Sequence, residues 1–242
     1  MIRDKNKDEQ YFINYLDENK KDVNNALESL TCGRKPPKTI LLLKFYIHNK
    51  KLDSLFAEYS LGVDIILLKE KFIILIVEWI NSFIYDSLDT ETTYGSYMDN
   101  VFMFGLCILF DIEESIINEI KKRLKKDKTN DWLYNFLLNP NCPPESIEGK
   151  LQLKSTYVDL QEVILTKDNQ KELFENYVTK LWYRKQKGCY WWGSHSRDNY
   201  NYYGYWCFEC AAVAKILGID DSALKDFKYY PYDLVHYDFN QD

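Results

Sequence analysis

Four side chains that can bind a soft metal lie close together near the end of the chain. Cys207 and Cys210 form a C-x-x-C pair, and Cys189 and His195 precede it. Four such ligands can hold a tetrahedral zinc ion. The pair falls within the helix-forming run YWCFECAAVAKIL, however, which places both sulfurs on one helical face, where packing accounts for them. The residues after His195 also fail to complete the H-x-E pattern of zinc deaminases. We therefore expect core cysteines and no metal.

The same region holds the residue types of a nucleophile, a base and an orienting acid. Cys189, Ser194, His195 and Asp198 would supply them. Sequence neighbours seldom form such a triad, and no G-x-S-x-G turn surrounds Ser194. Packing is again the favoured interpretation.

Glu209 lies in the helical run among neighbours that are almost all apolar. A buried and unpaired carboxylate would be costly and would become protonated instead. We expect a structural hydrogen bond to Arg197 or to tyrosine hydroxyls. The catalytic alternative is a small helical hydrolase, dependent on a metal or on a Glu and His pair, that uses Glu209, His195 or Cys207.

Residues 191–210 contain eight Phe, Trp and Tyr side chains, and such a platform could stack a sugar in a carbohydrate-binding module. Tyr205, Phe208, Ala212 and Ile216 nevertheless recur at three- and four-residue steps, the spacing of a buried helix face. Tyrosines there can bury their rings and still satisfy their hydroxyls. We expect these aromatic residues to build a core.

The charged residues are unevenly distributed. The net charge is −6, which argues against direct nucleic-acid binding, because phosphate backbones require a basic surface. Residues 72–120, which we call the base-free segment, contain no Lys or Arg. This distribution predicts an acidic face that could meet a basic partner. The segment's nine acids are Glu78, Asp86, Asp89, Glu91, Asp99, Asp111, Glu113, Glu114 and Glu119.

Helical periodicity dominates the chain, and no strand alternation or Gly-rich phosphate loop appears. In the first half it predicts helices over 7–31, 39–60 and 63–85, a fourth ending at 110, a fifth ending near 126 and a short one over 129–138. The helix over 63–85 is apolar nearly all round in its second half, so we expect it to be central. Asp111 and Glu114 have the spacing of a capping box at the start of the fifth helix.

Residues 139–149 are rich in Pro and Asn and form the best candidate boundary. Beyond them we predict helices near 154–166, 169–186 and 202–217, the last one ended by Gly218. The prediction is an all-α fold, a compact multi-helix bundle of two abutting helical domains over residues 1–139 and 140–242.

The sequence also suggests a cytoplasmic protein that does not enter a membrane. The start, MIRDKNKDEQ, lacks the apolar segment of a secretory signal, and the longest apolar runs are shorter than a membrane span of about 20 residues. Six cysteines in a chain of 242 residues suit reduced core positions better than a disulfide framework.

At residues 203–237 the run YGYWCFECAAVAKILGIDDSALKDFKYYPYDLVHY resembles the C-terminal domain of the PoNi immunity proteins. That family protects bacteria from PoNe, a polymorphic DNase toxin that type VI secretion delivers between competing cells. Three N-terminal stretches, over 3–19, 58–72 and 96–115, are similar to the companion domain. The departure is cysteine at 207 and 210, where Ser or Ala is expected in relatives.

The resemblance implies an α-helical, non-enzymatic protein without a cofactor that binds a cognate toxin and blocks its DNase activity. The base-free segment agrees with it, since an acidic face can compete for the basic surface of a DNase domain. The residues expected to face the toxin are chiefly Asp86, Asp89, Glu91, Asp99, Glu113 and Glu114, with Asp220, Asp221 and Asp233 as second candidates. The residues expected to fix the fold of the C-terminal motif are Tyr205, Trp206, Phe208, Glu209, Pro231, Tyr232, Asp233 and His236.

Overall fold

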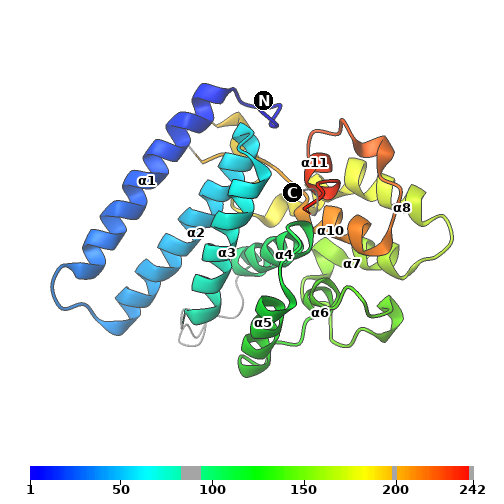
Figure 1. Ribbon diagram of the computed structural model, residues 1–242, viewed down its shortest axis with the longest axis horizontal. Coiled ribbons are helices and arrows are strands. Elements are labelled where there is room, and N and C mark those ends of the chain that lie inside the picture. Colours follow the sequence, from blue (N-terminus) through cyan, green and yellow to red (C-terminus); the bar gives the residue numbers. More distant parts are fainter. Residues whose placement is uncertain (83–93, 198–200, 240–242) are drawn as a thin grey trace. The chain divides into compact units, whose positions relative to one another are not determined.

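The computed structural model describes residues 1–82, 94–197 and 201–239, which contain helices and turns but no strand (Figure 1). The prediction of an all-α fold is confirmed. The chain forms two compact units, each built from two segments. Unit 1 comprises Met1–Glu91 and Gly193–Tyr205, and unit 2 comprises Thr92–Trp192 and Trp206–Asp242. The domain boundary after residue 139 stays a prediction, because these units divide the chain at other points.

Unit 1 contains the long helices α1 (Glu9–Thr31), α2 (Pro37–Leu61) and α3 (Ile65–Asn81), as the periodicity predicts. Aspartate side chains cap the amino-terminal ends of two of these helices. The Asp8 side chain accepts a hydrogen bond from the backbone N–H of Tyr11 at 2.8 Å, and Asp64 accepts one from Ile66 at 2.9 Å. Gly62 ends α2 with φ +94°, and a Cβ there would lie 2.1 Å from the carbonyl oxygen of Met1. Glycine is therefore required at this position.

Hydrogen bonds join α1 and α2 as an antiparallel pair (Figure 1). The buried amide of Asn19 donates to the carbonyl of Lys50 at 2.7 Å and to the Ser54 hydroxyl at 2.8 Å. The second segment of unit 1 is fixed in a similar way. The hydroxyl of Ser60 donates to the carbonyl of Tyr203 at 2.9 Å, and the Tyr202 hydroxyl donates to the carboxylate of Asp4.

The expectation that the helix over 63–85 is central is wrong for one face of α3. Phe72 and Ile76 are fully buried, whereas Leu67, Ile74 and Val77 are 51%, 62% and 40% exposed. Periodicity could not show this, because a helix that is apolar on every side gives no sign of which side lies outward.

The core of unit 2 is centred on the crossing of α4 (Tyr94–Leu109) and α10 (Phe208–Leu217). A Cβ at Gly105 would lie 3.1 Å from the backbone of Glu209, so the two helices approach closely there. Around them lie α5 (Glu114–Lys126), α6 (Trp132–Leu138), α7 (Lys154–Leu165), α8 (Gln170–Asn176), a π-helical turn (Tyr177–Leu181), α9 (Trp182–Lys185) and α11 (Tyr232–Val235).

The helix predicted over 202–217 starts later, at Phe208. Gly204 has φ +107°, which breaks the helix, and the backbone N–H of Cys207 donates to the carbonyl of Tyr229 at 2.9 Å. Tyr205 is buried, as expected, but it lies in this irregular segment and not on a helical stripe. Within the described ranges, no helix is both long enough and apolar enough to cross a bilayer.

Candidate functional site

The acids of the base-free segment have different surroundings in the structure. Asp86, Asp89 and Glu91 lie outside the described residues. Asp99, on α4, is only 4% exposed, so its carboxylate is not on the surface. Glu113 and Glu114 are exposed at the start of α5.

The turn into α5 explains why these two glutamates point outward. The backbone of Asp111 is left-handed, with φ +51°, and the next residue, Ile112, is buried against the end of α4. Glu113 is the N-cap residue, and its carbonyl accepts from the N–H groups of Ile116 and Ile117 at 3.0 and 3.2 Å. The predicted capping box is therefore wrong, since the N-cap is Glu113, two residues after Asp111. Acids at the first turn and bases at the last, as predicted, suit the helix dipole.

A hollow of about 480 Å³ adjoins the start of α5 within unit 2. Its apolar lining includes Cys107, Ile117 and Leu138, and its polar lining includes Asp111 and Glu114. Apolar side chains beside carboxylates suit a long basic side chain, whose methylene groups can pack while its charged end meets the acids.

Two lysines also line this hollow, and one of them has a structural role. Lys215, in the last turn of α10, donates to the carbonyl of Leu109 at 3.2 Å and so satisfies the end of α4. Lys121, the second, lies on α5. The hollow is therefore a mixed polar site with two lysines and two acids, Asp111 from the α4–α5 turn and Glu114 from the first turn of α5.

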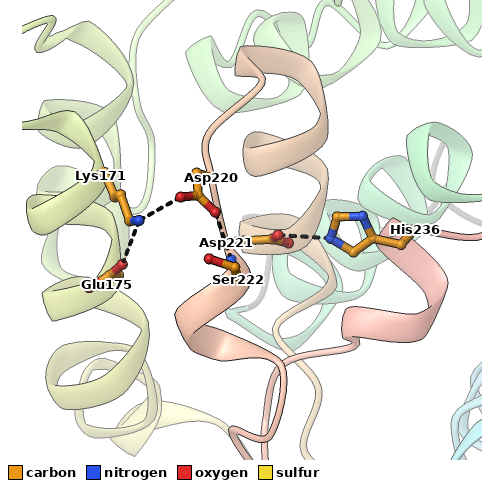
Figure 2. Close-up of polar contacts among 6 residues, drawn as sticks. All are labelled: Lys171, Glu175, Asp220, Asp221, Ser222 and His236. Atoms are coloured by element: carbon orange, nitrogen blue, oxygen red, sulfur yellow. Dashed lines mark hydrogen bonds and ion pairs between the residues drawn. The ribbon is translucent and has the colours of Figure 1, made fainter.

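Adjacent aspartates after α10 differ sharply in environment (Figure 2). Asp220 is exposed and points toward α8, where its carboxylate accepts from the ammonium of Lys171 at 2.6 Å. That hydrogen bond, together with those from Ser222, holds the pKa of the Asp220 carboxyl well below its usual range. Asp220 thus stays charged, although Lys171 partly compensates it.

Asp221 points the other way and is 2% exposed (Figure 2). Its carboxylate accepts from the Tyr230 hydroxyl at 2.7 Å and lies 2.8 Å from Nε2 of His236. The His236 ring packs on Tyr232 with the centroids 4.2 Å apart. Asp221 therefore ties the turn after α10 to α11. Asp233, on α11, is exposed.

Most of the residues expected to fix the C-terminal motif are buried. Trp206, Phe208, Glu209 and Pro231 are buried in unit 2, where Tyr232 is partly exposed. Tyr205 is buried in unit 1, where its hydroxyl lies 3.1 Å from the Ser194 hydroxyl and 3.1 Å from Nδ1 of His195.

Glu209 is fully buried. One carboxylate oxygen accepts from the indole N–H of Trp182 at 2.7 Å and from the Tyr157 hydroxyl at 3.4 Å. The other oxygen has no hydrogen-bond partner among the described residues. Burial raises the pKa of Glu209 to about 7, although these donors oppose the shift. The predicted hydrogen bond to Arg197 or to tyrosine hydroxyls is confirmed for the hydroxyl of Tyr157. The prediction does not include the indole of Trp182, because nothing in the local sequence points to a residue 27 positions away.

The cysteines of the C-x-x-C pair are buried as free thiols. The thiol of Cys207 donates to the carbonyl of Tyr229 at 3.0 Å, and burial raises the pKa of both Cys207 and Cys210. No group of three or more His, Cys, Asp or Glu side chains is arranged to hold a metal in the described part of the chain.

Two family models match the chain. The model of the PoNe immunity protein (PoNi) N-terminal domain matches residues 3–122, and that of the PoNi C-terminal domain matches residues 129–234. The chain belongs to the PoNi family. It is therefore an immunity protein against a PoNe nuclease toxin, and the resemblance noted in the sequence is confirmed.

Among solved structures, the chain is similar to protein PA2201 from Pseudomonas aeruginosa. The TM-score is 0.65 at 15% identity, and the match covers 92% of this PoNi chain and 86% of the other. This likeness shows the fold alone. No curated protein matches the chain.

Proposed function

We propose that this PoNi protein neutralises a basic DNase toxin of the PoNe type by binding over its DNA-binding surface. The binding surface would be acidic and centred on the start of α5. The observation that carries this proposal is the exposure of Glu113 and Glu114 within a segment that has no Lys or Arg from 72 to 120. Neutralisation requires binding and no catalysis by this chain.

An acidic surface at this position would be compatible with the start of a helix. Carboxylates at the first turn of a helix interact favourably with the positive end of its dipole, so acids at α5 need no basic neighbour to be tolerated. A cluster of this kind attracts a basic protein and raises the rate of association by long-range steering.

The hollow beside α5 would receive a lysine or arginine of the toxin. The side chain's stem would contact Ile117 and Leu138, and its charged end would reach Asp111 or Glu114. A residue that the toxin uses for a DNA phosphate would then be held by the immunity protein.

The residues that the sequence predicts to face the toxin differ in their exposure. Glu113, Glu114 and Asp233 are exposed and belong to the proposal, as does Asp220, whose charge Lys171 reduces. Asp86, Asp89 and Glu91 stay in the proposed interface on the basis of the sequence alone. Asp99 and Asp221 are buried, so we leave both out of the proposed interface. A DNase threatens the chromosome, and we place the encounter with the toxin in the cytoplasm.

The test is the double charge reversal Glu113→Lys/Glu114→Lys, measured as association and dissociation rates with the cognate toxin domain. We expect association to slow by about tenfold at low salt and by less at high salt, because screening removes the steering. Protection of cells that express the toxin should fall in parallel.

A matched control is Glu18→Lys/Glu28→Lys, which makes the same change in net charge with two exposed glutamates of α1. Equal association rates for the two double variants would remove the acidic start of α5 from the interface. A toxin domain that keeps its nuclease activity when saturated with this protein would contradict occlusion of the DNA site.

A further inference from the structure

Unit 1 has an open apolar groove over α2. The helix lies between α1 and α3 (Figure 1), and it provides the floor while the other two provide the walls. The groove has a volume of about 420 Å³. Its apolar lining consists of Leu16 and Val23 from α1, Leu55 from α2, and Ile74 and Leu75 from α3.

The exposure of Ile74 is the strongest indication that this groove binds another molecule. It is 62% exposed and lines the groove, and Val77, one helical turn further along α3, is 40% exposed. Apolar side chains this exposed on adjacent helical turns mark a site of interaction more often than isolated ones do. In the described part of the chain, no element covers Ile74.

Two ion pairs join the floor of the groove to its α3 wall and mark its length. Lys51 of α2 pairs with Glu78 of α3 at 2.7 Å, and Lys71 of α3 pairs with Glu58 of α2 at 2.6 Å. Each helix spans seven residues between its two pairs, which corresponds to about 10 Å, or two helical turns. The groove thus has the length and the helical walls that suit a short stretch of a fourth helix.

The charges along the rim give the groove a direction. Because α1 and α3 both run antiparallel to α2, Asp17 lies at the end marked by Glu58 and Lys71, and Lys20 lies at the end marked by Lys51 and Glu78. The first end has two acids and one base, and the second has two bases and one acid. A bound helix would match the charges at both ends of the groove if its amino-terminal end, the positive end of its dipole, lay beside Asp17.

We infer that this groove seats an amphipathic helix of the toxin, with aliphatic side chains at positions i, i+3 or i+4, and i+7 against Leu16, Leu55 and Ile74. The inference rests on the family's role as a toxin partner and not on the acidic surface of unit 2. A second copy of this chain fits less well, since a twofold pairing of the groove would bring two concave surfaces together. The contact is apolar, so it acts on the lifetime of the complex.

The test compares Ile74→Asp with Leu67→Asp in the full chain, using a catalytically inactive form of the cognate PoNe toxin domain. Leu67 is a matched control: it is on the same helix and 51% exposed, but it does not line the groove. We expect Ile74→Asp to raise the dissociation rate at least tenfold, with little effect of salt, and Leu67→Asp to stay within about twofold of the parent. Circular dichroism melting should show both variants folded, because both positions are exposed.

An unchanged dissociation rate for folded Ile74→Asp overturns the inference. So does a result in which Ile74→Asp abolishes self-association in sedimentation experiments and leaves toxin binding intact, because the occupant is then a second copy. A failure of the proposed acidic surface can be distinguished from a failure of this inference. If only the acidic surface is wrong, Glu113→Lys/Glu114→Lys leaves the association rate unchanged, while Ile74→Asp still raises the dissociation rate.

Discussion

Glutamates occur both in the exposed first turn of α5 and in the buried first turn of α10, and the two regions treat the carboxylate in opposite ways. Glu113 and Glu114 are exposed to solvent beside a helix dipole that favours their charge. Glu209 is fully buried, and its partners are the neutral groups of Trp182 and Tyr157. Burial raises the pKa of Glu209 to about 7, so its charge depends on pH in the neutral range.

This difference shows that an acid can be assigned to a toxin-binding surface only when the hydrogen-bond donors around it in its own chain are known. Asp131, the N-cap of α6, is as buried as Glu209 but is well supplied with donors. It accepts from the N–H groups of Leu133, Tyr134 and Gln152 at 2.8 to 3.0 Å, and from the Tyr97 hydroxyl at 3.0 Å. Such an acid is part of the fold, whereas the glutamates of α5 are available to a partner.

The largest effect should come from removing the well-supplied interior acid. Asp131→Ala would leave four donors without their acceptor, three of them buried, and we expect it to lower the free energy of unfolding by about 4 kcal/mol. Tryptophan fluorescence during urea unfolding would measure this, because five of the six tryptophans belong to unit 2. Asp8→Ala, which removes the exposed N-cap of α1, is the control and should cost about 1 kcal/mol. Similar costs for the two variants would refute the contrast between interior and surface caps.

Glu209→Gln should produce the next largest effect, and the effect should depend on pH. The folded carboxyl keeps its proton up to a pKa of about 7, whereas the unfolded one loses it near the usual pKa of 4.5. The folded state therefore binds more protons between these values, and this group's contribution to stability falls as the pH rises from 4.5 to 7. The fall is on the order of 3 kcal/mol.

Glutamine at 209 cannot ionise, but its oxygen can still accept from Trp182. The free energy of unfolding of Glu209→Gln, measured relative to the parent, should therefore rise between pH 4.5 and pH 8. Urea titrations at several pH values would show this, with Glu162→Gln, an exposed position on α7, as the control that stays flat. A difference between Glu209→Gln and the parent that does not change with pH would mean that Glu209 ionises normally.

The smallest effects should separate the adjacent aspartates shown in Figure 2. Asp221→Asn would weaken the contacts to Tyr230 and His236, and we expect a loss of about 1 to 2 kcal/mol in the free energy of unfolding. Asp220→Asn should leave the melting temperature unchanged, since its pair with Lys171 is exposed and screened. Equal melting temperatures for the two variants would show that burial does not distinguish these positions.

Much of the fold follows from the sequence, and the reasons are local. The helices α1 and α5 each have a charged and an apolar face, and their predicted ends at 31 and near 126 agree with the structure. The start of α10 was misplaced, because the positive φ of Gly204 and the hydrogen bond from Cys207 to Tyr229 prevent an earlier start. The hydrogen bond between Cys207 and Tyr229 joins residues that are far apart in the chain.

The candidate site could be predicted less completely. Counting charges singled out the base-free segment, but it could not show that Asp99 is buried while Glu113 is exposed. The groove of unit 1 was missed for a related reason. Its signal is present in α3, whose apolar residues exceed what one buried face requires, but a central helix would show the same excess.

Unit 1 is completed late in the synthesis of the chain. The Tyr202 hydroxyl bonds to Asp4, and the Asn6 amide donates to the same hydroxyl at 2.7 Å, across nearly 200 residues of chain. At about 5 to 20 residues per second, a ribosome needs roughly 10 to 40 s to produce that stretch. During this interval the first helices are synthesised without the segment that closes them, so unit 1 can form these contacts only after the residues near Tyr202 have been translated.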